Sequence, residues 1–397
     1  MSMTKKLKIV YAPGSGDIVK DHSNWLKKQD NPESVAIAYG CQFLEVCSAL
    51  DADAYIISPF RDKKFLRDDR FIIEHRPRPL INASGILYYL GQFWYELQLI
   101  ASAIRFRANV AVVSDGQTPW FVLSLLPWLG IQVIPSLHCT LWRKHIPPST
   151  ARKLILRLSR NFFAKDCVAI LAISDEIGEQ VVQLTQGQNK PILRFSPVYR
   201  REQFDGIDEP DENRSPFRVM FAGRIEHNKG VFDLLEIAKR LASEGRQDIT
   251  FDICGNGSAL ESLRLAAKEA RVEASFACHG FCNKIKMCEM LTRSHIVIVP
   301  TRTDFPEGFN KVVAEGILAC RPVVTSSVCP ALSDVREAVV EVPPDDIKGY
   351  SDAILRLCDD REFYEQKRRS CSKAQEQFYD LSKSWGAQLK SILINPY

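Results

Sequence analysis

The feature that most constrains this chain is a regular alternation of short apolar runs with longer amphipathic stretches, which continues over most of its length. Runs rich in β-branched residues predict strands, and the stretches between them have the periodicity of helices. This alternation is typical of βαβ units, in which helices cover both faces of a parallel sheet. We therefore expect an α/β protein built from doubly wound parallel sheets.

The first series of units fills the N-terminal half of the chain. We expect five strands, at 7–11, 54–57, 110–114, 132–136 and 169–173, and helices that include 34–50, 87–103 and 118–129. The pattern stops at residues 197–216, which are polar, charged and bracketed by prolines. Because such a segment offers no apolar face to bury, we predict a linker there, after a first domain of residues 1–196.

A second series of units follows the linker. Its strands are expected at 218–222, 250–254, 275–278, 295–300 and 322–325, within a second domain of residues 217–375. The amphipathic stretch 373–394 carries Tyr379, Trp385 and Leu389 on one face, which predicts a C-terminal helix within residues 376–397 that can pack back on the first domain. Ligands of parallel sheets bind outside the carboxyl ends of the strands, so two such domains predict a cleft between them.

Charge and cysteine content exclude several classes of protein. The net charge is only +4, from 52 basic and 48 acidic residues, so we expect no nucleic-acid partner. The twelve cysteines are scattered and lie mostly in apolar segments, which is typical of reduced thiols in the cytoplasm. The group Cys278, His279, Cys282 and Cys288 lacks the paired spacing of a zinc site, and we predict no metal.

Two segments of the sequence bear on membrane association. The apolar stretch from Ile86 to Ile104 is interrupted by Gln92, Glu96 and Gln98, so we expect a buried helix and no transmembrane span. The stretch Arg152 to Lys165 alternates basic and apolar residues at helical spacing. It predicts either a peripheral contact with the inner face of the membrane or an ordinary solvated helix.

A glycine-rich loop, Gly14-Ser15-Gly16, follows the first expected strand. Glycines let the backbone turn tightly and bring N–H groups close to an anion or a sugar. A nicotinamide-binding loop requires Gly or Ala where Val19 stands, which disfavours a dehydrogenase. An ordinary turn between strand and helix remains the alternative.

The corresponding loop of the second half carries Arg224 and Lys229. Arg presents a planar fork of donors and Lys a compact charge, and the two together suit a diphosphate. The alternative is a solvated basic turn with no specific ligand.

Two carboxylates, Glu307 and Glu315, follow the strand expected to end at Pro300. With a helix beginning near Gly308, they lie ~12 Å apart along its axis, which is too far for one acid and base pair. They must therefore have different roles. The free N–H groups from Gly308 to Lys311 predict an anion site at the N-terminus of this helix.

These segments together resemble the retaining glycosyltransferases of family 4, which have the GT-B fold. The resemblance rests on the spacing of the two glutamates, on the Arg321-Pro-Val-Val run after them and on three glycine-containing loops earlier in the second half. Those loops are Ala222-Gly-Arg224 with Lys229-Gly230, Ile253-Cys-Gly255-Asn-Gly257 and Cys278-His-Gly280-Phe281. The first half resembles the family less closely, through the Gly14 loop, Pro135-Ser-Leu-His138 and Ala172-Ile-Ser174-Asp-Glu176.

The resemblance implies two Rossmann-like doubly wound domains that face each other across a cleft, the first on the acceptor side, and it implies roles for single residues. Glu315 would hold the ribose hydroxyls of a nucleotide-sugar donor, and Glu307 would approach its sugar. Arg224 and Lys229 would neutralise the diphosphate, while His138 would contact the transferred sugar. The implied catalytic residues are Glu307, His138, Arg224 and Lys229, and the implied donor-binding residues are Gly14, Ser15, Gly16, Arg224, Lys229, Gly255, Gly280, Phe281, Glu307, Gly308, Phe309, Asn310 and Glu315.

Metal and cofactor requirements follow from the charge that develops in such a reaction. A departing diphosphate gains negative charge, and the sequence shows no Asp-x-Asp motif at a strand end. Fixed cations and helix dipoles would take the place of Mg²⁺, so we expect no metal and no cofactor.

Some positions depart from the family pattern. Asn310 replaces a commoner small residue, Arg321 stands where Gly usually precedes Pro-Val, and residues 335–344 lack the usual glycine turn. The first departure bears on the identity of the donor sugar and the others on loop shape.

The acceptor stays open, as a glycan, a lipid-linked saccharide or a small molecule in polysaccharide or glycoconjugate biosynthesis. Three alternatives to a transferase remain: a nucleotide-sugar epimerase, a glycan phosphorylase and a non-catalytic nucleotide-sugar-binding scaffold. A phosphorylase needs a lysine in a pyridoxal site, which we do not find, and a scaffold would be favoured by the loss of Glu307 or Arg224.

Overall fold

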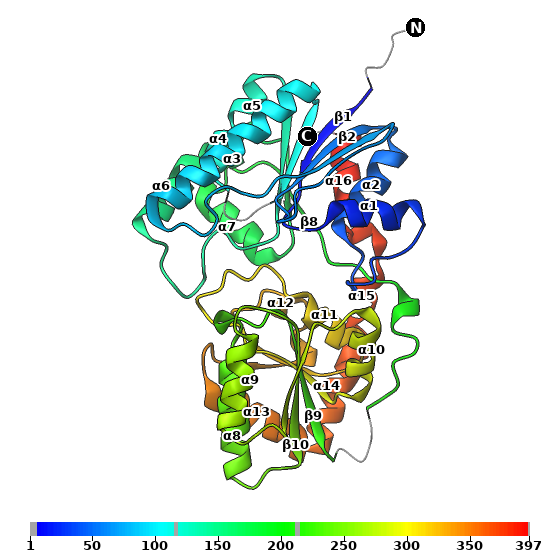
Figure 1. The fold of residues 1–397 in the computed structure, drawn as a ribbon, viewed down its shortest axis with the longest axis vertical. Coiled ribbons are helices and arrows are strands. Elements are labelled where there is room, and N and C mark those ends of the chain that lie inside the picture. Colours follow the sequence, from blue (N-terminus) through cyan, green and yellow to red (C-terminus); the bar gives the residue numbers. More distant parts are fainter. Residues whose placement is uncertain (1–5, 115–117, 211–214, 396–397) are drawn as a thin grey trace.

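Two α/β domains lie one above the other in the computed structural model, which describes residues 6–114, 118–210 and 215–395 (Figure 1). Each domain has one sheet covered by helices on both faces, and their apolar side chains form the cores. The expected fold class is therefore confirmed. No described helix is both long enough and apolar enough to cross a membrane.

The N-terminal sheet has the strand order β3-β4-β2-β1-β5-β6-β7-β8. All neighbouring strands run parallel except β3 and β4, which are antiparallel. The strands are β1 (Lys8–Ala12), β2 (Asp53–Ser58), β3 (Phe65–Arg67), β4 (Phe71–His75), β5 (Val110–Ser114), β6 (Gln132–Leu137), β7 (Ile170–Ala172) and β8 (Ile192–Arg194).

Two sets of helices cover this sheet. Helices α1, α2 and α16 lie on one side of it, whereas α3 to α6 lie on the other (Figure 1). The helices of this half are α1 (Ile18–Leu26), α2 (Tyr39–Ala49), α3 (Gly85–Phe106), α4 (Trp120–Leu123), α5 (Leu125–Trp128), α6 (Thr150–Asn161) and α7 (Asp175–Thr185).

The C-terminal sheet is wholly parallel, in the order β11-β10-β9-β12-β13-β14. Its strands are β9 (Phe217–Ala222), β10 (Ile249–Cys254), β11 (Phe276–Gly280), β12 (Ile296–Val299), β13 (Val323–Ser326) and β14 (Val339–Val342). Its helices are α8 (Val231–Ser243), α9 (Leu260–Glu269), α10 (Lys284–Arg293), α11 (Lys311–Leu318), α12 (Leu332–Val335), α13 (Ile347–Asp359) and α14 (Arg361–Ala374), and α15 (Glu376–Tyr379) and α16 (Trp385–Ile394) follow.

The ten expected strands are all present, and four more were not predicted. These are β3, β4, β8 and β14, which lie at or next to the sheet edges. They are only three to five residues long and carry polar or charged residues, so they lack the long apolar runs of the central strands.

The single helix predicted at 118–129 is wrong. The structure has two four-residue helices there, α4 and α5, which meet at Ser124. Pro127 is the reason, because a proline inside a continuous helix loses a hydrogen bond and clashes with the preceding turn. A new helix that begins at Leu125 places this proline in its first turn, where its missing N–H costs nothing.

The C-terminal stretch 373–394 is broken rather than continuous. The side chains of Asp380 and Ser384 accept backbone N–H groups and begin new helical turns, so the chain bends before α16. Helix α16 then packs against α2 of the N-terminal domain, where Gln42 accepts the backbone N–H of Gly386 at 2.8 Å. The chain therefore crosses between the domains twice.

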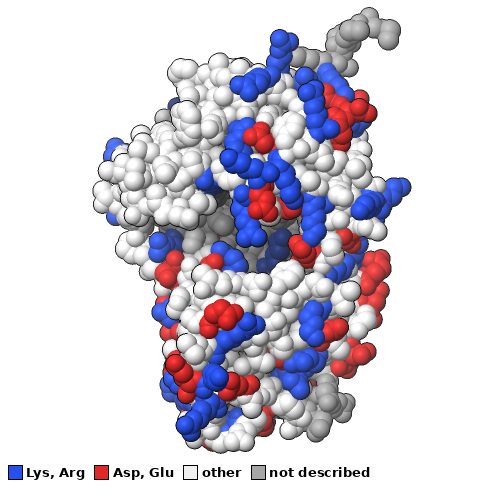
Figure 2. Space-filling model, viewed as in Figure 1, with Lys and Arg blue, Asp and Glu red and all other residues white. Residues whose placement is uncertain are grey.

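Helix α3 is buried on one side only, so the prediction of a buried helix is correct in part. Its buried side carries Tyr95, Leu99 and Ile100 as well as Gln92, Glu96 and Ser102, and its outward stripe is also apolar. That stripe consists of Ile86, Leu87, Leu90, Trp94, Leu97, Ala101 and Ile104. On this side of the N-terminal domain, Figure 2 shows a broad white area without acidic side chains.

Candidate functional site

The carboxyl ends of the two sheets face the boundary between the domains, and the loops that follow the strands meet there. Gly308 touches the backbone of the opposite domain, because a Cβ at this position would overlap the carbonyl oxygen of His138. Only glycine fits this approach. The loop after β12 therefore contacts the loop after β6.

Arg224 and Lys229 share one aromatic ring. The Lys229 Nζ lies 3.5 Å from the centroid of Phe305, and the Arg224 guanidinium carbon lies 5.3 Å from it. Both cations follow β9, whereas Phe305 follows β12, the adjacent strand of the sheet. Lys229 is buried, but the Arg224 side chain is 58% exposed and pairs only with Glu226 among the described residues, at 3.1 Å. A ligand can therefore reach Arg224 directly.

Glu307 is the partner of Lys229. Its Oε2 lies 2.6 Å from the Lys229 Nζ and also accepts from Asn310 at 3.2 Å and from Thr301 at 3.4 Å. The side chains of Glu307 and Lys229 are only 10% and 11% exposed. This ion pair fixes the carboxylate next to the basic loop.

The backbone at the start of α11 explains why Asn310 departs from the family pattern. Helix α11 begins at Lys311, not near Gly308 as predicted, and Asn310 is its N-cap with φ of +71°. Asn tolerates this left-handed backbone better than most residues. Its side chain accepts the N–H of Val312 and donates to Glu307, so it caps the helix and orients the carboxylate.

Glu315 lies in a different environment from Glu307. It is 7% exposed, and no hydrogen bond to its carboxylate exists among the described residues. Burial raises the pKa of Glu315 to about 7, and the charge of Lys311 opposes this shift. A buried acid without a donor is a group that a ligand hydroxyl can satisfy.

The glycines of the second half bring three loops together. Gly255, with φ of +142°, has no room for a Cβ because the carbonyl of Gly223 lies against it, and its N–H donates to Gly280 at 2.7 Å. Phe281 follows directly and is 55% exposed. The loops after β9, β10 and β11 therefore form one continuous edge, which ends in an exposed aromatic ring.

The N-terminal domain contributes a cavity of about 630 Å³ to the same boundary. Gly14, Ser15, Gly16 and His138 line it, together with Lys311 of the C-terminal domain. The structure therefore brings these predicted residues together, while Arg224, Lys229 and Glu307 form a second cluster. The contact of Gly308 with His138 joins the two groups.

His138 is held in place by a relay from the C-terminal helix. The indole N–H of Trp385 donates to the Ser136 hydroxyl at 2.8 Å, and this hydroxyl lies 2.9 Å from the His138 Nε2. Because Ser136 already accepts from Trp385, its own proton is available to the histidine. The rings of Tyr39 and Phe195 pack on His138 at 4.7 and 5.1 Å between centroids.

Phe309, a predicted donor-binding residue, lies elsewhere. Phe309 is 2% exposed and its ring packs in the core against Phe378, so the ring does not face the cleft. Arg321 is fully buried and donates to four backbone carbonyls, of Leu291, Thr292, Ala319 and Asp208. It therefore joins α10, the end of α11 and the linker instead of lining the cleft.

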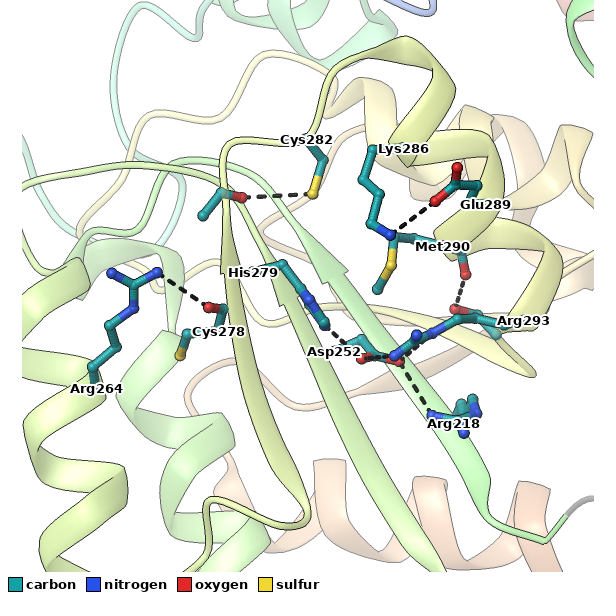
Figure 3. A network of polar contacts seen from close by, with 12 residues as sticks. Arg218, Asp252, Arg264, Cys278, His279, Cys282, Lys286, Glu289, Met290 and Arg293 are labelled. Atoms are coloured by element: carbon teal, nitrogen blue, oxygen red, sulfur yellow. Dashed lines mark hydrogen bonds and ion pairs between the residues drawn. The ribbon is translucent and has the colours of Figure 1, made fainter.

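The cysteine group that resembles a zinc site makes other contacts. The ring N–H of His279 donates to the carboxylate of the buried Asp252 at 2.7 Å, and the thiol of Cys282 donates to the Gly280 carbonyl (Figure 3). Arg293 and Arg218 also approach Asp252. Within the described ranges, no group of three or more His, Cys, Asp or Glu is arranged to hold a metal ion.

Three further residues belong to the site without a sequence pattern that predicts them: Phe305, Lys311 and Asp21. Phe305 lies in the acidic segment, but no pattern indicated that it would support both cations. Lys311 lies over the ring of Tyr39 at 4.5 Å. Asp21 lines the N-terminal cavity, and burial raises its pKa to about 6. Both Asp21 and Glu315 act electrostatically on Lys311, a convergence that only the tertiary fold creates.

Residues 204–378 match the family model described as Glycosyl transferases group 1. The matched segment contains the loop with Arg224 and Lys229, the two glutamates Glu307 and Glu315, and the glycine loops of the second half. The chain is a GT-B glycosyltransferase. Among curated proteins, this glycosyltransferase is similar to the alpha-D-kanosaminyltransferase of Streptomyces kanamyceticus, with 24% identity over 72% of this chain and 76% of that relative.

Solved structures share the fold. The Anabaena protein Alr3699/HepE, solved in complex with UDP, matches with a TM-score of 0.66 and 13% identity over 98% of this chain and 99% of its own. The sucrose-phosphate synthase of Thermosynechococcus elongatus matches with a TM-score of 0.72 and 12% identity over 98% of both chains. The expected GT-B architecture of the glycosyltransferase is confirmed.

The environment of Glu315 predicts a pH dependence of stability. The pKa is about 7 in the folded protein and has an ordinary value of 4.5 in the unfolded chain, so folding takes up a proton between these values. The free energy of unfolding should fall by about 3 kcal/mol from this group as the pH rises from 4.5 to 7. The Glu315→Gln variant should lack this contribution.

Urea unfolding of both proteins at pH 5 and pH 8 measures the effect. We expect the free energy of unfolding of the variant, minus that of the wild type, to be larger at pH 8 than at pH 5. An equal difference at both pH values would show that Glu315 is not a desolvated acid. Glu269→Gln, at an exposed position of α9, serves as the control.

Proposed function

We propose that the protein is a retaining, metal-independent glycosyltransferase of family 4 that transfers a sugar from a nucleoside-diphosphate donor to an acceptor. The observation that carries this proposal is the pair of cations on Phe305, beside the Lys229–Glu307 ion pair. Two fixed positive charges at the carboxyl end of a strand suit a diphosphate leaving group.

The charges that develop in the reaction agree with this arrangement. The bond between the anomeric carbon and the diphosphate oxygen breaks, while a bond forms to the acceptor oxygen and the acceptor proton moves to the diphosphate. Arg224 and Lys229 stabilise the departing negative charge. Glu307, held next to them, faces the positive charge that develops on the sugar ring.

The donor is a nucleotide sugar, and Glu315 and Phe281 support its nucleotide part. The carboxylate of Glu315 has no donor of its own among the described residues, and ribose hydroxyls supply such donors. The exposed ring of Phe281 lies after the glycine edge, where a base can stack. The Anabaena protein of the same fold is known in complex with UDP and with UDP-glucose.

The acceptor binds in the N-terminal cavity in this proposal. Carboxylates, amides and hydroxyls line the cavity, which suits a glycan, a saccharide-bearing lipid or another polyol. The reaction takes place in the cytoplasm and serves polysaccharide or glycoconjugate assembly. A lipid-linked acceptor would also explain a peripheral membrane contact through Arg152 to Lys165.

Variants of the two cations test the placement of the diphosphate. Arg224→Ala and Lys229→Ala should each lower turnover by roughly two to three orders of magnitude, because each removes one fixed charge from the transition state. Arg224→Lys should restore only part of the loss, since an ammonium group lacks the bidentate fork. Donor hydrolysis or transfer is measured with UDP-, GDP- and ADP-sugars, with and without EDTA.

Arg369→Ala and Lys268→Ala are the matched controls, because both side chains are exposed and make no ionic contact with a described residue. Activity should survive EDTA. Near wild-type turnover in both cation variants would place the diphosphate elsewhere. Loss of activity in EDTA with recovery in Mg²⁺ or Mn²⁺ would refute metal independence.

Loss of the Glu315 carboxylate should weaken nucleotide binding. Glu315→Ala removes charge-assisted hydrogen bonds that each contribute ~1.5 to 3 kcal/mol, so the Kd for a nucleoside diphosphate should rise by tenfold or more. Calorimetry at pH 8 measures this affinity, with Glu269→Ala as the control. Unchanged affinity in the folded variant would overturn the role of Glu315.

A further inference from the structure

One side of the N-terminal domain carries exposed apolar side chains that are not part of the core. The outward stripe of α3 presents Ile86, Leu90, Trp94 and Leu97 to solvent, with exposed fractions of 79%, 55%, 57% and 44%. A surface helix ordinarily turns its charged face outward. On α3 the outward face is apolar as well, since its buried side carries Tyr95, Leu99 and Ile100 together with Gln92, Glu96 and Ser102.

The apolar surface continues beyond α3. Helix α4 contacts α3, α5 and α6, so these four helices form one layer on this side of the sheet (Figure 1). Trp128 of α5 is 85% exposed, and Leu154 and Leu158 of α6 are 56% and 48% exposed. We call this surface the α3 face, and it consists of Ile86, Leu87, Leu90, Trp94, Leu97, Ile104, Leu125, Trp128, Leu129, Leu154 and Leu158.

Basic residues outnumber acidic ones in the part of the sequence that forms the α3 face. Residues 76–165 contain eleven Lys and Arg but only two acidic residues, Glu96 and Asp115, in a chain that is otherwise close to neutral. Glu96 is buried. Figure 2 accordingly shows no acidic side chain on the white lobe of the N-terminal domain. An apolar surface with a cationic surround is complementary to an anionic lipid bilayer, because the acyl chains accept apolar side chains and the headgroup phosphates attract cations.

A basic cavity opens directly beside the apolar stripe. It has a volume of about 520 Å³, and its lining includes Trp94 of the α3 face together with Lys63, Arg76 and Arg105. Glu74 and Ser102 hold Arg76. Within the part of the chain that is described, Lys63 and Arg105 form no hydrogen bond or ion pair, so both remain available to an anion.

The basic residues of α6 do not all contribute. Arg152 donates to the Leu141 carbonyl at 2.8 Å, and Arg160 donates to Gln186 at 2.8 Å, so these two side chains support the fold. Lys153 and Arg157 are exposed and lie next to Leu154 and Leu158. Helix α6 therefore supplies two cations to the rim of the α3 face.

We infer that the α3 face docks on an anionic lipid surface and that the basic cavity beside Trp94 receives the phosphate of a lipid headgroup. The apolar stripe enters the boundary between headgroups and acyl chains, and Lys153, Arg157, Lys63 and Arg105 contact the phosphates. This docking widens the contact proposed for α6. It needs neither a donor nor catalysis, so it can be tested apart from the transferase reaction.

Sedimentation with vesicles tests the inference on the full chain without nucleotide. The protein should sediment with phosphatidylcholine vesicles that contain phosphatidylglycerol and not with phosphatidylcholine alone. Each basic residue near such a surface contributes about fivefold to partitioning, so Lys63→Gln with Arg105→Gln, and Lys153→Gln with Arg157→Gln, should each lower binding by more than tenfold. Lys268→Gln with Lys373→Gln, both exposed on the C-terminal domain, should change nothing.

The apolar part is tested in parallel. The triple variant Ile86→Ser, Leu90→Ser and Trp94→Ser should no longer sediment with vesicles. The control is the double variant Leu265→Ser and Ile285→Ser, at two exposed apolar positions of the C-terminal domain, and it should sediment like the wild type. The tryptophan emission of the wild type should shift to the blue on vesicle binding, and Trp94→Phe with Trp128→Phe should lose this shift. Thermal unfolding of each variant controls for folding.

Three outcomes would overturn the inference. The wild type would fail to sediment with anionic vesicles, or free glycerol phosphate would displace it and so identify a soluble phosphate as the ligand. In the third outcome, the wild type would not bind vesicles and sedimentation velocity would show a dimer. If the substitutions at Ile86, Leu90 and Trp94 converted this dimer to monomers, the α3 face would be an interface between two copies of the chain.

Discussion

The orientation of the two sheets determines where chemistry is possible in this protein. Parallel strands deliver their following loops to one edge, and here the two edges meet, so residues from β1, β6, β9 and β12 converge at one boundary. Gly308 against His138 shows how closely the loops approach. The second crossing of the chain, through α16, ties the C-terminus to the N-terminal domain. Trp385 then links this crossing to His138 through Ser136.

Electrostatics distinguishes the two glutamates of the acidic motif. Glu307 accepts hydrogen bonds from Lys229, Asn310 and Thr301. Glu315 lies within helix α11, which follows the loop of Glu307. It is buried without a hydrogen-bond donor among the described residues, and burial raises its pKa. A short segment of sequence thus supplies one carboxylate that is paired with a lysine and one buried carboxylate without a donor among the described residues. These environments fit the different roles that the proposed transfer assigns to them.

The parts that the sequence predicted are those with strong local patterns. The central strands are long apolar runs, and the spacing of Glu307 and Glu315 is a local feature of one strand, loop and helix. The edge strands and the break at Pro127 depend on tertiary packing or on a single residue within an otherwise periodic stretch. Phe305 and Lys311 belong to the site because distant segments fold around them, and no local pattern shows such a convergence. Arg321 stands at a position where glycine is usual, and it donates to four carbonyls from three segments, namely α10, the end of α11 and the linker.

We propose transfer with retention from a nucleoside-diphosphate sugar, with the leaving group stabilised by Arg224 and Lys229. The anomeric configuration of the first product distinguishes retention from inversion, and proton NMR can follow it from the earliest turnovers with the donor that a screen identifies. We expect the anomeric coupling constant of the product to match that of an α-linked donor. A product with the opposite configuration at the earliest time points would contradict it.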